Sequence, residues 1–150
     1  MNREQVLIEM IKVGNLPYIW GGEGPWGYDC SGLAQKLLAL VNLDPKGDQT
    51  AHKLYEHFCG AGRPVLEPVQ KPDLMDLIFF GHPKKVTHVG IGIGNGLMIE
   101  AGGGDSSTTT VERAKAQDAK VRVRPIDSRK DVIVIIRPDG LPWAHDAHKL

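Results

Sequence analysis

The hydrophobic period of the chain changes once, near residue 74, and this change constrains the fold more than any other feature. Before it, apolar side chains recur at helical spacing. After it, short alternating or continuous apolar runs are typical of strands. The predicted helices cover residues 3–13, 29–41 and 48–58, and the predicted strands cover 77–80, 86–93, 97–101, 120–126 and 131–137. This order indicates an α+β fold, with N-terminal helices packed on a central antiparallel β-sheet.

The length of the chain bounds its domain organisation. A chain of 150 residues has the size of one domain, and it contains no internal repeat or linker that would divide it. We assign residues 1–138 to this single domain. The segment 139–150 lacks periodicity, so we expect it to be a C-terminal extension.

Charge and composition exclude several classes of function. Lys plus Arg and Asp plus Glu both number 18, so the net charge is zero and attracts neither nucleic acid nor anionic lipid over long range. No apolar run approaches the roughly 18 residues of a membrane span, and the N terminus lacks a secretory signal, so we expect a chain that is cytoplasmic as synthesised. The His and Cys residues lack zinc-ligand spacing, and we expect no metal and no cofactor.

Cys30 is a candidate nucleophile because of its place at the start of a predicted helix. Asp29 is a favoured N-cap, and the unpaired amides and dipole of the first helical turn stabilise a thiolate. Ser31 and Gly32 are small and would leave room for a substrate carbonyl, while the amide of Cys30 could donate to an oxyanion. The alternative is a buried, inert cysteine. Cys59, at the end of a helix, is expected only to pack.

His88 is a candidate base, and the register of the predicted hairpin decides its neighbour. A three-residue loop at 94–96 pairs Ile93 with Leu97 and keeps the apolar side chains on one face. A two-residue turn would instead mix the charge of Glu100 into that face. We predict the first register, which places His88 and Glu100 together on the opposite face.

This pairing would give the histidine an orienting partner. Glu100 could accept a hydrogen bond from one imidazole nitrogen of His88 and leave the other nitrogen free to take a thiol proton. Gly90 and Gly92 on the same face would leave open space beside them. The alternative is a histidine and a glutamate exposed on the solvated face of a hairpin.

Four segments together resemble the NlpC-type family of papain-like cell-wall cysteine peptidases. They are PYIWGG at 17–22, YDCSGL at 28–33, DLIFF at 76–80 and HVGI at 88–91, within a match that runs from about residue 3 to residue 101. The resemblance implies a papain-like fold in which the cysteine helix packs on the sheet that carries the histidine. It also implies hydrolysis of peptidoglycan stem peptides, usually between D-glutamate and a diamino acid.

The resemblance also implies roles for individual residues. Cys30 would be the nucleophile, His88 the base and Glu100 the third polar member. Tyr18 and Asp29 fall where the family lines its substrate cleft, Tyr18 to contact the tetrahedral intermediate and Asp29 to hold a substrate amine, although Tyr18 could simply pack and Asp29 could simply cap. The predicted substrate-binding set is Tyr18, Trp20, Asp29 and Ser31, in which Trp20 offers a large apolar surface.

The sequence departs from the family pattern at two positions. The third member is often His, whereas here it is Glu100, which could orient the imidazole and would raise its pKa. Met75 stands where the family usually has glycine. The turn-rich stretch 102–110 lacks the Lys of a phosphate-binding loop, so it is either an edge of the cleft or a plain surface connection.

We therefore expect a peptidoglycan endopeptidase whose partners are stem peptides and whose oligomeric state is left open. A phage lysin or a tail-associated enzyme would reconcile a leaderless chain with a substrate outside the cytoplasm. Two alternatives are an acyl or amide transferase of the same papain-like group and a catalytically silent structural or wall-binding phage protein.

Overall fold

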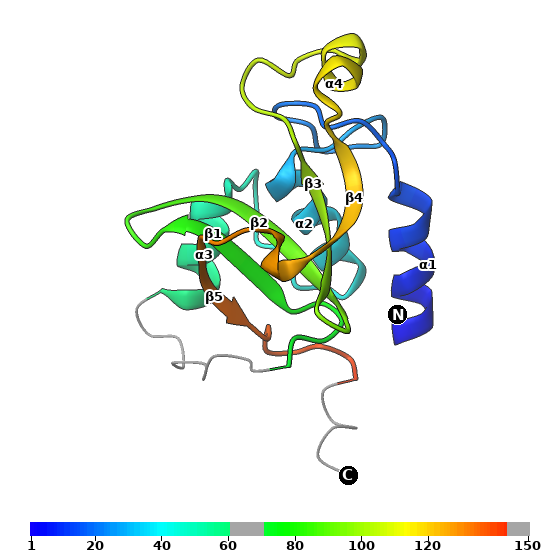
Figure 1. Ribbon diagram of the computed structural model, residues 1–150. Helices are drawn as coiled ribbons and strands as arrows, with labels where there is room; N and C mark the ends of the chain where they lie inside the picture. The colour runs from blue at the N-terminus through cyan, green and yellow to red at the C-terminus, as the bar shows by residue number, and fades with distance from the viewer. Residues whose placement is uncertain (61–70, 144–150) are drawn as a thin grey trace.

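The computed structural model describes residues 1–60 and 71–143 and confirms the α+β class (Figure 1). The helices are α1 (Arg3–Val13), α2 (Cys30–Leu40), α3 (Ala51–Cys59) and α4 (Val111–Gln117). The strands are β1 (Leu77–His82), β2 (Lys85–Gly94), β3 (Leu97–Gly102), β4 (Lys120–Pro125) and β5 (Val132–Ile136). A short 3-10 turn at Ile126–Ser128 connects β4 to β5.

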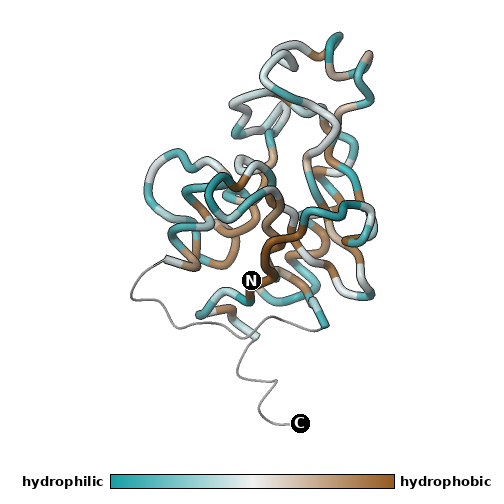
Figure 2. The backbone as a smooth tube through the Cα atoms, turned by 60° about the vertical axis from the view of Figure 1, so that its left-hand side comes forward, coloured by the Kyte–Doolittle hydropathy of each residue, from teal (hydrophilic) through white to brown (hydrophobic). Residues whose placement is uncertain are grey.

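The five strands form one antiparallel sheet in the order β4-β3-β2-β1-β5. Helix α2 packs against β2 and β3, and α3 packs against β2. Inward-facing side chains such as Phe79, Val89 and Ile91 join Leu33 and Leu37 of α2 in the main core. Figure 2 shows the hydrophobic segments gathered in the middle of the molecule and hydrophilic residues along the outer loops. This burial is the main force that holds the helices on the sheet.

The first three helices begin where the sequence offers a side-chain cap. Asn2 caps α1, Asp29 caps α2 and Thr50 caps α3, each by accepting a hydrogen bond from a backbone amide of the first turn. The range predicted for the first helix is therefore confirmed. The third helix begins at residue 51 rather than 48, because Thr50 holds the extended backbone of an N-cap.

In the hairpin between β2 and β3, the side chains share faces as predicted, but the connecting turn differs from the predicted one. Ile91 pairs with Ile99 as expected, but Gly94 rather than Ile93 pairs with Leu97. The connection is thus a two-residue turn, and a β-bulge at Ile93 restores the register that a plain two-residue turn would have lost. The loop length was predicted wrongly, whereas the sharing of faces was predicted correctly.

Helix α4 was not predicted. Thr110 caps it by accepting from the amide of Arg113, and the sequence VERAKAQ consists mainly of good helix formers. The turn-rich residues that precede it obscured this short helix. In Figure 1 the loop that follows α1 lies close to α4, where Trp20 donates from its backbone amide to the carbonyl of Thr108 at 2.8 Å.

The C-terminal segment packs on the domain as far as the structure describes it. Leu141 is buried in the main core, and Trp143 packs against it. Arg3 of α1 lies over the Trp143 ring, 5.6 Å from its centroid, and forms an ion pair with Asp73. The predicted domain boundary at residue 138 stays a prediction, and its residues 144–150 lie outside the described part of the chain.

Met75, the residue that departs from the family pattern, is fully buried with a φ of 70°. This left-handed conformation is the one that glycine adopts most readily.

None of the helices within residues 1–60 and 71–143 is both long enough and apolar enough to cross a membrane.

Candidate active site

Cys30 is the first residue of α2, as the sequence predicts. The carboxylate of Asp29 accepts from the amide of Gly32 at 2.7 Å, which fixes the first turn of the helix around the thiol. Cys30 is half-buried and lines a pocket, so the end of the helix faces this pocket. Unpaired amides and the positive end of the helix dipole therefore lie beside the sulfur.

His88 of β2 and Glu100 of β3 form a buried pair in the same pocket. Nε2 of His88 lies 2.9 Å from Oε2 of Glu100, and only 8% and 1% of the two side chains are exposed. The solvent-exposed alternative for this pair is therefore wrong. The hydrogen bond to the carboxylate leaves Nδ1 as the ring nitrogen available to Cys30.

The two side chains hold each other in charged forms. Burial alone would lower the pKa of His88, but hydrogen bonding and charge from Cys30 and Glu100 raise it to about 9. Burial would likewise raise the pKa of Glu100, but His88 and then the neighbouring arginines bring it below its ordinary value. The imidazole is thus suited to carry a proton at neutral pH.

The pocket joins the predicted triad to residues from four other segments. Its lining comprises Tyr18, Cys30, Thr87, His88, Glu100, Ala101, Gly102, Gly103, Gly104, Arg122, Arg124 and Arg129. The residues 102–104 of the turn-rich stretch therefore border the pocket, which fits the cleft-edge alternative. The space expected beside Gly90 and Gly92 is filled, because a Cβ at these positions would lie 2.6 Å from Sδ of Met98 and from the carbonyl oxygen of Asp73, respectively.

Three arginines of the pocket were missed by sequence reasoning. Arg122 lies directly opposite Glu100 in the β3–β4 ladder, and Arg124 lies two residues further along β4. Their guanidinium nitrogens are 4.0 Å and 3.8 Å from Oε1 of Glu100. The alternation of basic and apolar residues over 120–125 is the signal that could have found Arg122 and Arg124, once this strand is paired with β3.

Tyr18 is the member of the predicted substrate-binding set that lines the pocket. It is almost wholly buried, and the backbone of Gly104 packs against its ring so closely that a Cβ there would lie 2.3 Å from the ring. Burial raises the pKa of Tyr18, and the negative charges of Cys30, Asp29 and Asp105 raise it further. The phenol therefore stays protonated and can donate a hydrogen bond.

Asp29 and Ser31 adjoin Cys30 in sequence but lie outside the described lining of the pocket. Asp29 accepts from the amides of Gly32 and Gly21 and from the hydroxyl of Ser31 at 3.3 Å. Burial raises the pKa of Asp29 in spite of these hydrogen bonds. The place expected for a substrate beside Gly32 is taken by the chain itself, because a Cβ on Gly32 would lie 2.0 Å from the carbonyl oxygen of Gly22.

Two exposed tryptophans mark the loop between α1 and α2. Trp20 is 53% exposed and Trp26 is 84% exposed, whereas Tyr28 of the same loop is buried. Trp20 also lies outside the described lining of the pocket. Its predicted contact with substrate stays a prediction.

Cys59, the second cysteine, lies in different surroundings from Cys30. Cys59 ends α3 and packs partly buried against the core, and burial raises the pKa of its thiol. Across residues 1–60 and 71–143, no three His, Cys, Asp or Glu side chains gather closely enough to hold a metal ion.

The family profile described as NlpC/P60 matches residues 14–125, a region that contains the predicted triad and both arginines of β4. The chain belongs to the NlpC/P60 family. The bifunctional muramidase/DL-endopeptidase CwlT of Bacillus subtilis is 38% identical over 103 residues. This match covers 65% of the present chain and only 29% of CwlT.

Solved structures of NlpC/P60 proteins share the fold. The peptidoglycan hydrolase RipB of Mycobacterium tuberculosis matches with a TM-score of 0.64 and 27% identity, over 90% of this chain and 63% of that chain. RipD of the same organism, described as a non-catalytic NlpC/p60 domain protein adapted to peptidoglycan binding, has a TM-score of 0.62 at 23% identity and covers 90% of this chain and 95% of that chain. The fold is therefore found in hydrolases and in a binding protein, and the residues of the site must distinguish the two.

Proposed function

We propose that this protein is a cysteine endopeptidase that cleaves the stem peptides of peptidoglycan between D-glutamate and the following diamino acid. The observation that carries the proposal is the buried 2.9 Å hydrogen bond between His88 and Glu100, in the pocket that also contains the thiol of Cys30. A protein that only bound the wall would have no need for this arrangement. The names of CwlT and RipB support the choice of substrate.

The proposed reaction follows from the placement of the three side chains. In the reactive form of the pair, the proton of the Cys30 thiol has passed to Nδ1 of His88, and the thiolate attacks the amide carbon of the substrate. The oxyanion forms beside the amides of the first turn of α2. The C–N bond then breaks as His88 returns the proton to the leaving amine. Finally, His88 deprotonates a water molecule that hydrolyses the thioester and restores the thiol.

Replacing Cys30 by Ala tests the nucleophile, with Cys59→Ala as the matched control. We expect Cys30→Ala to abolish the release of peptide fragments from purified muropeptides, as measured by mass spectrometry. Cys59→Ala removes a thiol of similar burial at the end of α3, away from the pocket, and should leave turnover unchanged. Normal cleavage by Cys30→Ala would overturn the proposal.

The same measurement addresses the alternatives. A transferase would pass the acyl group of the thioester to an added amine, and its product would carry the mass of that amine rather than of water. A silent wall-binding protein, as RipD is described, would show no turnover at all. The phage setting predicted from the sequence stays a prediction.

A further inference from the structure

The pocket around Cys30 is positively charged although the chain as a whole is neutral. Arg122, Arg124 and Arg129 all line it, and Glu100 is the only carboxylate among the described lining residues. Asp131 pairs with Arg129 from outside the lining. Among the lining residues and the ion-pair partner of Arg129, three guanidinium groups thus meet two carboxylates, and one positive charge is left over. Transfer of a proton between Cys30 and His88 leaves this balance unchanged.

Glu100 does not satisfy the arginines that face it. Its Oε2 is occupied by His88, and its Oε1, although buried, has no hydrogen-bond partner within the described chain. The separations of 3.8 Å from Arg124 and 4.0 Å from Arg122 are too long for direct hydrogen bonds. Nε of Arg122 is also buried without a partner among the described residues. Buried polar groups of this kind ordinarily have a partner, so the unpaired nitrogens of the arginines are suited to a further ligand.

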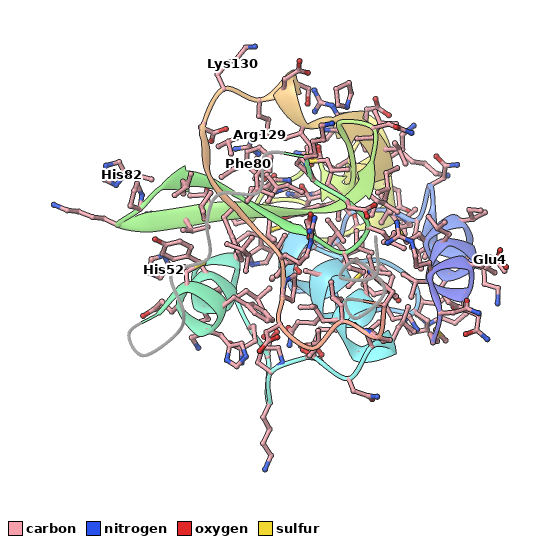
Figure 3. All side chains as sticks on the ribbon, turned by 90° about the horizontal axis from the view of Figure 1, so that it is seen from below. Glu4, His52, Phe80, His82, Arg129 and Lys130 are labelled. Carbon is pink, nitrogen blue, oxygen red and sulfur yellow. The ribbon has the colours of Figure 1, made fainter. Side chains whose placement is uncertain are left out.

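Arg129 is held rigidly at the edge of the same pocket. Its Nε and one terminal nitrogen donate to the two oxygens of Asp131 at 3.0 Å and 2.8 Å. Cζ of Arg129 lies over the Phe80 ring, 4.8 Å from its centroid, and this ring in turn contacts the ring of His88. Figure 3 shows Arg129 beside Phe80, while the neighbouring Lys130 points away from the molecule. Arg129 keeps one terminal nitrogen that Asp131 does not use.

We propose that these arginines bind a free carboxylate that the substrate carries next to the scissile amide. This inference rests on the proposed function, because it names the peptides that the same site prefers. A guanidinium group matches a carboxylate in geometry and charge. An amide in that position would carry no charge, and its N–H donors would face the N–H donors of the arginines. Arg124 and Arg129 are 35% and 31% exposed, so they can reach a bound peptide, whereas Arg122 lies deeper.

A stem peptide offers such a carboxylate on either side of the bond. A D-glutamate that is linked through its side chain keeps its α-carboxylate, and a diaminopimelate keeps a second carboxylate of its own. Three synthetic tripeptides separate the two sources: Ala–γ-D-Glu–diaminopimelate, its D-glutamate α-amide, and its diaminopimelate amide. We expect one of the amides to lower kcat/KM by about 10- to 100-fold, as the loss of a charge-assisted hydrogen bond does.

Arg124→Gln, Arg129→Gln and the double variant test whether the arginines cause this preference. Lys130→Gln is the matched control, since it removes the same charge one residue from Arg129 but from an exposed side chain. The arginine variants should bring the acid-to-amide ratio of kcat/KM toward one, and Lys130→Gln should preserve it. A role only in positioning Glu100 would lower kcat/KM for all three peptides alike and leave the ratio unchanged.

The outcomes separate this inference from the proposed function. Equal cleavage of all three peptides by the wild type, or a preference that survives in the double variant, overturns the carboxylate site and leaves the peptidase intact. Failure of the wild type to cleave any of them removes the proposed function and this inference with it. Arg124→Gln alone keeps the test decisive if the double variant does not fold, because Arg124 is half-exposed and its ion pair is long.

Discussion

The acid–base behaviour of the site depends on two side chains that the sheet keeps away from water. Burial works against the charge on both His88 and Glu100. Hydrogen bonding and charge from Cys30 and Glu100 outweigh it at His88, and His88 and the neighbouring arginines outweigh it at Glu100. The identity of the residue at position 100 therefore matters. A neutral side chain there could orient the ring of His88, but it could not offset the cost of burying the charge of the imidazolium. A carboxylate in this position both orients the ring of His88 and stabilises its protonated form.

At the residue scale, Glu100→Gln should lower activity and shift its pH dependence. The wild-type kcat/KM should fall as the pH rises through about 9, because His88 then loses the proton that the leaving amine requires. Without the carboxylate, burial is less opposed, so this alkaline limb should move to lower pH. We also expect kcat/KM at neutral pH to drop by about 100-fold, the lower end of the range for general acid–base catalysis.

Glu112→Gln provides the control for this experiment, since Glu112 is exposed in the first turn of α4. Its pH profile should match that of the wild type. An alkaline limb that stays in place in Glu100→Gln would show that the carboxylate does not stabilise the imidazolium.

At the scale of elements, the N terminus of α2 is the unit that presents the thiol. Asp29 fastens three groups at once, the amides of Gly21 and Gly32 and the hydroxyl of Ser31. Gly32 then allows the carbonyl of Gly22 to approach the helix. The loop before the helix and its first turn thus form one structure, and a change in either should displace the sulfur.

Asp29→Ala should therefore reduce both stability and turnover. The free energy of unfolding should fall by about 0.5–2 kcal/mol, the usual cost of losing an N-cap, as measured by urea denaturation. Thr50→Ala removes the equivalent cap of α3 and should cost a similar free energy without loss of activity. Asp29→Asn keeps a capping oxygen, so its KM should stay close to that of the wild type. A large rise in KM for Asp29→Asn would indicate instead that Asp29 binds a substrate amine.

The helices and strands could be predicted to the extent that their signals are local. Asn2, Asp29 and the alternation of β2 mark their elements within a few residues of sequence. The bulge at Ile93 could not be predicted, because a three-residue loop and a two-residue turn with a bulge keep the same apolar faces together, and the hydrophobic pattern does not distinguish them. Likewise, the arginines of β4 reach the pocket only through pairing with β3, and no local pattern states that pairing.

At the scale of the whole molecule, the described C-terminal residues contribute to the same core as the helices. Leu141 is 2% exposed within the main core, and Gly140 lies against Leu43. The pattern of the sequence after residue 138 did not reveal this burial, because a single leucine without periodic neighbours carries no signal.

Leu141→Ala should consequently destabilise the fold by about 2–5 kcal/mol, the cost of a large-to-small change in a core. Pro142→Ala, at the exposed neighbouring position, should change the unfolding midpoint little. Urea denaturation measures both. If Leu141→Ala proved neutral, residues after 138 would form an extension that the domain does not need.

The contact of Arg3 with Trp143 has a consequence for how this domain can be joined to others. It brings the first helix and the last described residues side by side, while the thiol lies in a pocket lined by other segments. Neighbouring termini are the usual condition for circular permutation. A permutant that links these two ends and opens the exposed turn at Asn95 should retain both its fold and its pocket.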